Sequence, residues 1–433
     1  MKRSLAAILS FLFIILLVGC TPTADPSGDT LNSVENSVSE QPNETSGIEA
    51  SDIQPDETSK PVKEEPKFDV WDGSVATSYA GGTGTKDDPY RIETGAQLAF
   101  FAIRVNAGAN YSNMYISLEN NLDLNNIEWA PIGSGTYRFQ GTFDGGNHII
   151  RNIKIVTAVR TKYSYSSTGS LGNGASGLFG ICENANIHNL KIDNINIDVP
   201  SNLNFDRIYV GALAGRVESS NYLFSQFTNI KISNATVNVS QYECIMNIGG
   251  CIGLLYVSDN GWFESDSIQC MSTLSGELND SKNYFGGIAG YVETHGYSEF
   301  LNFACYTDVY WPTSTTENYL GAFGALNSFS GDTKLENGFA KISPSTKTSQ
   351  INHTAYVISG KLYNSAEPLG NYVFKNIYGN ITYPRSGQTS IYLSRNYSSW
   401  ININSEGCIA LPSYHGLPES IWDLSSLSNP VLK

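Results

Sequence analysis

Gly177-Leu178-Phe179-Gly180 is the first of five short glycine-bounded apolar motifs, and their regular spacing decides the fold. A second motif, Asn152-Ile153-Lys154-Ile155, recurs between them. Successive copies of either motif lie 34 to 40 residues apart. Two motifs that keep one loose period indicate a solenoid of stacked units. The later copies are Gly211-Ala212-Leu213-Ala214-Gly215, Gly249-Gly250-Cys251-Ile252-Gly253, Gly286-Gly287-Ile288-Ala289-Gly290 and Gly321-Ala322-Phe323-Gly324, and Asn189-Leu190-Lys191-Ile192, Asn229-Ile230-Lys231-Ile232, Ser267-Ile268-Gln269-Cys270 and Asn302-Phe303-Ala304-Cys305.

Apolar and polar residues alternate within each repeat, which is typical of strands with one buried face. We therefore expect an all-β fold, a right-handed parallel β-helix, in which equivalent residues of successive repeats stack. The uneven spacing of the two motifs favours one three-stranded coil per repeat, with two coils as the alternative. The expected ladders are two apolar ones and a polar one: Ile155, Ile192, Ile232, Cys270 and Cys305; Ile153, Leu190, Ile230, Ile268 and Phe303; and Asn152, Asn189, Asn229, Ser267 and Asn302.

The regions around the repeats divide the rest of the folded part. Residues 68–150 are expected to form an N-terminal cap and the first coils, 151–330 the repeats, and 331–433 degenerate C-terminal coils with a cap. Thr94-Gly95-Ala96-Gln97 fits a capping box, and Leu98, Phe101, Ala102 and Val105 follow at helical spacing. Because an open solenoid end exposes apolar rungs, we expect this helix to be a lid.

The N-terminal region indicates export. Lys2 and Arg3 precede an apolar run that ends Leu17-Val18-Gly19-Cys20, so residues 1–20 are expected to be a signal peptide. The end of the run resembles the bacterial lipobox, which implies lipidation of Cys20 and attachment to the membrane through that lipid. Residues 21–67 hold 11 acidic residues against three lysines and no aromatic residue. Such a segment is expected to be a disordered acidic linker.

Several stretches resemble GLUG-motif bacterial surface proteins. The family implies a β-helical, extracellular, cell-attached protein. Some of its members carry metalloprotease domains, but the His-Glu-x-x-His zinc motif is absent here, so that role does not transfer. The resemblance rests on Gly81–Ile92, Gln97-Leu98-Ala99, Trp129–Gly133, Phe139–His148, Gly177–Gly180, Ala185–Leu190, Ile421–Leu424 and Pro430–Leu432.

The residues that could carry chemistry are scattered. The five histidines, His148, His188, His295, His353 and His415, show no metal-ligand spacing, so we expect structural roles, no metal and no cofactor. Asp87-Asp88 and Asp144-Gly145-Gly146-Asn147 suit turns, with calcium as the alternative. The remaining cysteines are expected to be free buried thiols, although export permits disulfides: Cys182, Cys244, Cys251, Cys270, Cys305 and Cys408.

The folded part carries 30 acidic against 21 basic residues without a basic stripe, which argues against nucleic acid as a partner. Tyr163-Ser164-Tyr165-Ser166, Tyr306, Tyr310 and Trp311 are candidate contacts for an extracellular glycan or protein. No catalytic motif is found, and Asp193, Asp198, Glu243 and Glu277 do not form a convincing cluster. We expect a non-enzymatic cell-surface adhesin. The alternatives are a polysaccharide lyase or hydrolase and a passive envelope scaffold.

Overall fold

The computed structural model describes residues 65–161, 172–203, 205–240, 244–276, 282–311, 318–346, 354–355, 358–359, 361–363, 371–381, 403–406, 417–425 and 430–433. They belong to one compact unit, Glu64–Lys433. The signal peptide, Cys20 and nearly all of the linker lie outside the described residues, as do His353, His415, Cys408, Glu243, Glu277 and residues 163–166. The expectations about these residues therefore stay predictions.

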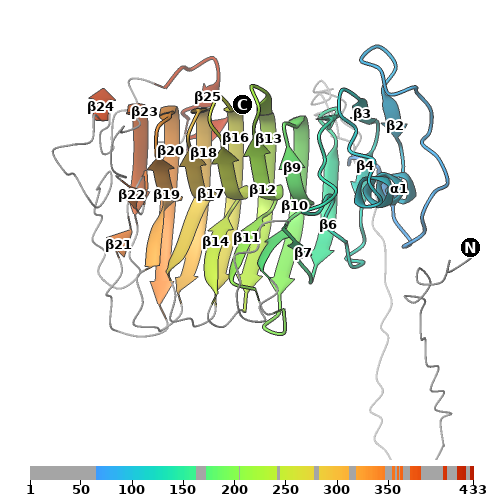
Figure 1. Ribbon diagram of the computed structural model, residues 1–433, viewed down its shortest axis with the longest axis horizontal. Coiled ribbons are helices and arrows are strands. Elements are labelled where there is room, and N and C mark those ends of the chain that lie inside the picture. Colours follow the sequence, from blue (N-terminus) through green and yellow to red (C-terminus); the bar gives the residue numbers. More distant parts are fainter. Residues whose placement is uncertain are drawn as a thin grey trace, which may run out of the picture. The chain divides into compact units, whose positions relative to one another are not determined.

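Two sheets form a parallel β-solenoid of about 5 turns, which confirms the expected fold class. Figure 1 shows the strands stacked along the long axis, with the helix at the N-terminal end. The first sheet runs β1 (Phe68–Val70), β4 (Asn121–Asp123), β6 (Ile149–Ile155), β10 (Asn186–Val199), β13 (Phe224–Val239), β16 (Trp262–Gly276), β18 (Tyr297–Trp311), β20 (Asp332–Thr346), β23 (Tyr372–Ile381) and β24 (Ile403–Glu406). Beside this path lie β2 (Tyr90–Ile92), β3 (Tyr115–Leu118) and β5 (Thr142–Asp144).

The second sheet contains the glycine motifs. Its strands are β7 (Val159–Arg160), β8 (Asn173–Ser176), β9 (Phe179–Glu183), β11 (Arg207–Gly211), β12 (Ala214–Ser219), β14 (Ile245–Gly249), β15 (Ile252–Val257), β17 (Asn283–Thr294), β19 (Asn318–Ser328), β21 (Thr354–Ala355) and β22 (Leu362–Tyr363). Each repeat places its glycine motif in this sheet and its asparagine motif in the first sheet, so one repeat makes one coil.

The apolar ladders are confirmed from the second rung onward. Leu190 pairs with Ile230, which pairs with Ile268, and the ladder that contains Cys270 and Cys305 follows in register. The expected first rung is wrong: Ile153 pairs with Ile195, and Ile155 pairs with Ile197. The reason is that β10 contains two similar runs, Asn189-Leu190-Lys191-Ile192 and Asn194-Ile195-Asn196-Ile197, and β6 matches the second.

Asparagines mark the bends that divide the long strands of the first sheet. Asn189, Asn229 and Asn302 have φ of 55°, 52° and 48°, a left-handed conformation that asparagine tolerates better than most residues. Their amides hydrogen bond along the stack, as from Asn229 Nδ2 to Asn189 Oδ1 at 2.8 Å. The polar ladder is thus confirmed for the later rungs, while Asn152 belongs to a second bend with Asn194, whose amide donates to it at 2.6 Å.

The interior of the solenoid is apolar and contains free thiols. Large side chains from both sheets, such as Phe227, Phe263, Phe285 and Phe323, are fully buried in one cluster. The five described cysteines are free and buried, as predicted: Cys182, Cys244, Cys251, Cys270 and Cys305. Burial raises the pKa of the Cys270 thiol to about 12, so this group behaves as a small hydrophobic residue.

Helix α1 (Gly95–Asn106) is the expected lid. The Thr94 hydroxyl accepts a hydrogen bond from the Gln97 N–H, and the Gln97 side chain accepts one from the Thr94 N–H, which completes the predicted capping box. Leu98, Phe101 and Val105 are fully buried in the same cluster as the rungs. The helix therefore covers the apolar end of the first coils.

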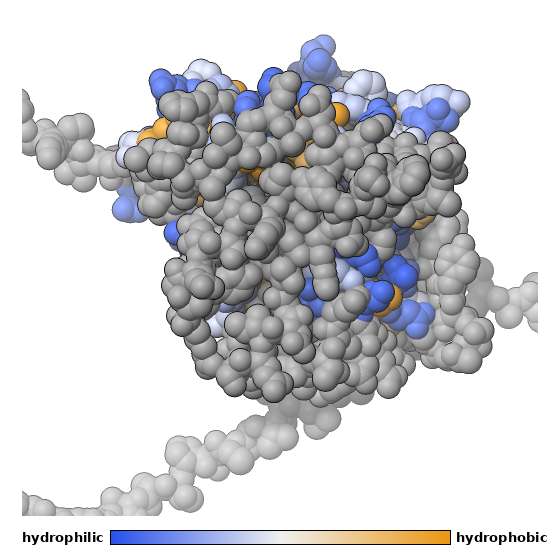
Figure 2. All heavy atoms as spheres, turned by 90° about the vertical axis from the view of Figure 1, so that its left-hand side faces the viewer, coloured by the Kyte–Doolittle hydropathy of each residue, from blue (hydrophilic) through white to orange (hydrophobic). Residues whose placement is uncertain are grey.

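The C-terminal segment, whose residues 421–424 and 430–432 carry part of the family resemblance, lies outside the stack of coils. β25 (Trp422–Asp423) and β26 (Val431–Leu432) form an antiparallel hairpin that packs on the outer face of the first sheet. Trp422 is buried against Ala304, Phe339 and Tyr378, whose side chains point outward because Phe303 and Ala340 point inward. The hairpin thus covers apolar side chains on the sheet face. Figure 2 shows the C-terminal end, where described residues at the surface are mainly hydrophilic.

Candidate functional site

The histidine and aspartate residues singled out in the sequence make structural contacts. Asp144 accepts the Gly146 N–H at 2.9 Å and the Asn189 amide at 3.1 Å, and its carboxylate lies 3.3 Å from His188 Nδ1. His295 stacks on Phe329 with a centroid distance of 4.7 Å. These contacts support the turn interpretation of Asp144, and no group of three or more metal-ligating side chains is found among the described residues.

The Asp144 contacts predict an acid-sensitive step in stability. Hydrogen bonding to His188 comes first among the causes that lower the pKa of Asp144 from 3.8 to about 2. Because the folded pKa is depressed, the stabilisation is present above pH 3.8 and is lost as the pH falls toward about 2. Asp144→Asn is expected to flatten this part of the profile, measured as the free energy of urea unfolding against pH. An unchanged slope would contradict this assignment.

The other sequence candidates are likewise engaged in structural contacts. Asp88 forms an ion pair with Arg91 at 3.0 Å inside a turn. Asp193 accepts hydrogen bonds from Ser233 and Asn234, and Asp198 accepts one from Asn238. The Tyr306 hydroxyl donates to the Pro430 carbonyl and so holds the C-terminal hairpin. Among the predicted tyrosine contacts, Tyr310 is exposed.

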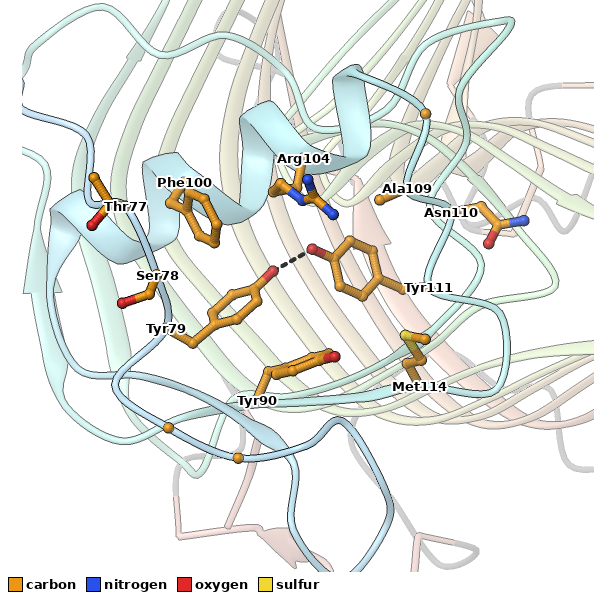
Figure 3. Close-up of a pocket in the computed structure, with 13 residues that line it drawn as sticks. Thr77, Ser78, Tyr79, Tyr90, Phe100, Arg104, Ala109, Asn110, Tyr111 and Met114 are labelled. Atoms are coloured by element: carbon orange, nitrogen blue, oxygen red, sulfur yellow. Dashed lines mark hydrogen bonds between the residues drawn. The ribbon is translucent and has the colours of Figure 1, made fainter.

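A pocket of about 530 Å³ lies beside the exposed face of α1 and is the candidate binding site. Four segments line it: the loop before β2, the first residue of β2, helix α1, and the loop between α1 and β3. Figure 3 shows the rings of Tyr79, Tyr90, Phe100 and Tyr111 around the cavity, with Arg104 at its helix side. Apart from Met114, the other lining residues are small or polar: Thr77, Ser78, Gly81, Gly82, Gly108, Ala109 and Asn110.

Two glycines explain why the first loop folds over β2. A side chain at Gly82, which has φ of 89°, would place its Cβ 1.8 Å from the Pro89 carbonyl oxygen. The Gly81 carbonyl accepts the Arg91 N–H at 3.0 Å, which holds the loop at the strand. The close approach stacks Tyr79 on Tyr90, with ring centroids 4.7 Å apart. The Gly81-Gly82 motif thus builds one wall of the pocket.

The pocket combines aromatic faces with neutral hydroxyls. The Tyr79 and Tyr111 hydroxyls hydrogen bond to one another, as Figure 3 shows. Burial is the main cause that raises the pKa of each phenol, so both stay protonated at neutral pH. Tyr111 also has φ of 58°, a costly conformation for an aromatic residue that is common at functional sites. The lining contains no Asp, Glu, His or Lys, and its one charged side chain is Arg104.

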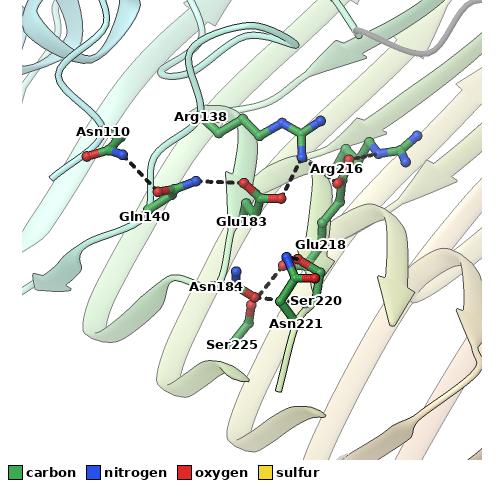
Figure 4. Close-up of polar contacts among 10 residues, drawn as sticks. All are labelled: Asn110, Arg138, Gln140, Glu183, Asn184, Arg216, Glu218, Ser220, Asn221 and Ser225. Carbon is green, nitrogen blue, oxygen red and sulfur yellow. Dashed lines mark hydrogen bonds and ion pairs between the residues drawn. The ribbon is translucent and has the colours of Figure 1, made fainter. Parts of the chain in front are cut away.

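A chain of polar contacts leads from the pocket to the second sheet (Figure 4). Asn110 donates to Gln140 at 2.9 Å, and Gln140 donates to Glu183 at 2.6 Å. Arg138 then bridges Glu183 at 2.8 Å and Glu218 at 2.6 Å. Arg216 donates to Glu218 at 2.6 Å. Each carboxylate of this network is paired with an arginine and lies outside the pocket lining.

Sequence reasoning did not find this site. Its aromatic residues come from separate segments without a motif, and the lid helix was interpreted only through its buried face. One available signal was the outer face of α1, where Phe100 and Arg104 lie four residues apart and so share one side of the helix. The carboxylate and arginine network was missed because Arg138 lies outside the periodic repeats.

No family model matches the chain, so the GLUG assignment stays a prediction. A protein of Evansella cellulosilytica, provisionally named Gly-rich membrane protein, is 32% identical over 146 residues. The match covers 33% of this chain and 14% of that relative. The chain is therefore a distant relative of one part of a much longer protein.

Two solved structures match the chain at low similarity. A structure provisionally assigned as an immunoglobulin A1 protease from Bacteroides ovatus has 18% identity and a TM-score of 0.42, over 82% of this chain and 95% of that one. A second structure, an IgA1 protease, has 13% identity and a TM-score of 0.37, over 67% of this chain and 20% of that one.

Among the described residues, no helix is long and apolar enough to cross a membrane.

Proposed function

We propose that this protein is a lipid-anchored cell-surface adhesin whose solenoid binds an extracellular glycan in the pocket beside α1. The observation that carries this proposal is the lining itself: four aromatic rings, two protonated phenols, one arginine and an amide. Aromatic faces pack against the apolar C–H faces of sugar rings, and the hydroxyl and amide groups suit sugar hydroxyls. Arg104 adds hydrogen-bond donors at the rim.

The N-terminal sequence supports a surface location. The export signal ends at Cys20, and the acidic segment up to residue 67 gives a spacer between an anchor and the folded unit. The name of the Evansella cellulosilytica relative, a membrane protein, is compatible with this location. In this proposal, lipidation of Cys20 holds the chain on the membrane and the solenoid faces the exterior.

Binding without cleavage is favoured by the place of the carboxylates. Glycosidases use a pair of carboxyl groups that flank the scissile bond. Here the pocket lining has no carboxylate, and Glu183 and Glu218 are neutralised by arginines. A lyase or hydrolase would need an acid or base that the pocket does not offer, so we propose that the bound glycan stays intact.

Two neighbouring residues of α1 test the proposal. Phe100 lines the pocket, while Ile103 is 51% exposed on the same helix and does not line it. On a glycan array and then by calorimetry, the purified 64–433 unit is expected to bind a glycan. Phe100→Ala is expected to weaken that binding about tenfold, since a lost aromatic contact of about 1.4 kcal/mol corresponds to a factor of ten in affinity. Arg104→Met is expected to weaken it as well.

Ile103→Ala is the matched control and should bind like the wild type. Thermal unfolding of each variant separates a lost contact from a lost fold. A purified unit that binds no glycan on the array, or an affinity that Phe100→Ala and Arg104→Met leave unchanged, would contradict the proposal. Binding to a protein with no glycan would replace it by a protein-binding adhesin.

A further inference from the structure

An outward-facing row of side chains runs along the solenoid from the pocket to β18. Tyr115, next to Met114 of the pocket, pairs with Thr142, and the same position continues through Asn186, Gln226, Glu264 and Glu299. Since neighbouring strands lie about 4.8 Å apart, these five steps span about 24 Å. The pocket and the far strands thus share one continuous edge.

On β13, β16 and β18, aromatic side chains occupy the position two residues before this row. Phe224 pairs with Trp262, which pairs with Tyr297, and we call these three residues the aromatic column. Phe224 is 41% exposed and Trp262 is 50% exposed. The Trp262 and Tyr297 rings meet edge to face at 4.9 Å. A large aromatic side chain that is half exposed in the middle of a stacked ladder has apolar surface available for a ligand.

The turn before Phe224 adds to the same surface. Tyr222 is 82% exposed and Leu223 is 54% exposed. Tyr222 also has φ of 61°, so this aromatic residue, like Tyr111 in the pocket, adopts a costly left-handed conformation. Among the described residues, large apolar side chains with this much exposure come together in sequence only here, at 222–224.

The polar groups on this edge fit a neutral, hydroxyl-rich polymer. Gln140 and Asn184 stand two residues before Thr142 and Asn186, so they occupy the equivalent position between the pocket and Phe224. No lysine or arginine occupies that position from Gln140 to Tyr297. Glu264 lies two residues beyond Trp262, on the same side of β16, without an ion-pair partner among the described residues. A free carboxylate accepts hydroxyl hydrogen bonds and repels an acidic polymer.

The backbone excludes a peptide that adds as a strand. The strands of the column are interior strands of a parallel sheet, and their N–H and C=O groups are used in the ladders. Strand addition needs an open sheet edge. Recognition along this edge therefore comes from side chains, and these include aromatic rings, amides and carboxylates.

We propose that the glycan is an extended neutral chain, with one end in the pocket and its length lying along Gln140 and Asn184 to the aromatic column. This inference rests on the proposed glycan-binding function and names the size and charge of the ligand. A monosaccharide would fill the pocket alone. Trp262 lies on β16, four steps from Tyr115, so a chain that covers about 19 Å or more would contact it as well.

The test measures affinity against chain length. Linear neutral gluco-, xylo- and manno-oligosaccharides of increasing length are titrated into the full chain in detergent. Affinity is expected to rise with length until the chain reaches Trp262 and then to stay level. Trp262→Ala should weaken the longest oligosaccharide about tenfold and leave the shortest unchanged, and Trp262→Phe should retain most of the affinity. Ile103→Ala is the control, because Ile103 is 51% exposed but lies outside both the pocket lining and the column.

Each outcome separates the two proposals. Short oligosaccharides that bind, with an affinity that neither length nor Trp262→Ala changes, would overturn the extended-chain inference and leave the pocket function standing. If the shortest oligosaccharides do not bind at all, the result would contradict the pocket function. An acidic oligogalacturonate that binds more tightly than its neutral counterpart, or phosphatidylcholine vesicles that bind only when Trp262 is present, would overturn the neutral glycan as the occupant.

Discussion

Replacing Gly290 by alanine is expected to destabilise the central coils by about 3 kcal/mol, at the upper end of the usual cost of overpacking. Gly290 follows the apolar residues of the fourth glycine motif. A Cβ at this position would lie 2.6 Å from the Ile248 backbone nitrogen and 2.8 Å from the Gly253 carbonyl oxygen. Both neighbours are backbone atoms of stacked strands, so neither can move without breaking the register. The glycine is required by this close approach of the strands.

The matched control is Gly276→Ala. Its added Cβ would meet the terminal methyl group of Met246 at 3.0 Å, and a methionine end can shift at little cost. Urea unfolding followed by circular dichroism measures both variants. We expect a large fall in the midpoint for Gly290→Ala and a small one for Gly276→Ala. Equal stability of the two variants would contradict the proposed role of the glycine motif.

Replacing Arg138 by methionine is expected to cost about 3 kcal/mol, because it leaves carboxylates without their partner in a largely buried place. The Arg138 side chain is 10% exposed and bridges Glu183 and Glu218, of which Glu218 is 7% exposed. Methionine keeps the volume of the aliphatic part of the arginine side chain. The measured loss of stability therefore comes from the missing charge and its hydrogen bonds. Arg216 still neutralises one of the two carboxylates, which limits the loss.

Two controls distinguish this effect from a general loss of charge. Adding Glu183→Gln to the Arg138→Met background is expected to restore part of the stability, since an amide costs less than an unpaired carboxylate to bury. Arg91→Met removes an arginine from the exposed pair with Asp88 and should change stability by less than about 1 kcal/mol. Chemical denaturation at neutral pH measures all of these variants. A loss below about 1 kcal/mol for Arg138→Met would show that the network does not stabilise the fold.

The periodic part of the fold could be predicted because each rung repeats the same physical requirement. Asparagine at the left-handed bends and alternating apolar residues recur often enough to define the period. The first rung was misplaced because Asn189 and Asn194 begin similar runs, and spacing alone cannot choose between them. The C-terminal hairpin could not be placed from the sequence, because nothing in it shows that Trp422 packs on an outer sheet face.

The site was less predictable because it is assembled from residues outside the period. Tyr79, Phe100 and Tyr111 come from two loops and a helix, and only the tertiary arrangement brings them together. The aromatic column was visible in the sequence as Phe224, Trp262 and Tyr297 at one repeat position. It could not be recognised without the register, which shows that these residues pair and that two of them are widely exposed.

The most direct test of binding without cleavage is mass spectrometry of the bound glycan after long incubation with the protein. The proposed function predicts a glycan of unchanged mass that dissociates intact and can bind again. A shortened or unsaturated product, lost when Glu183 or Glu218 is replaced by glutamine in a variant that still folds, would contradict it and establish an enzyme that acts on polysaccharide.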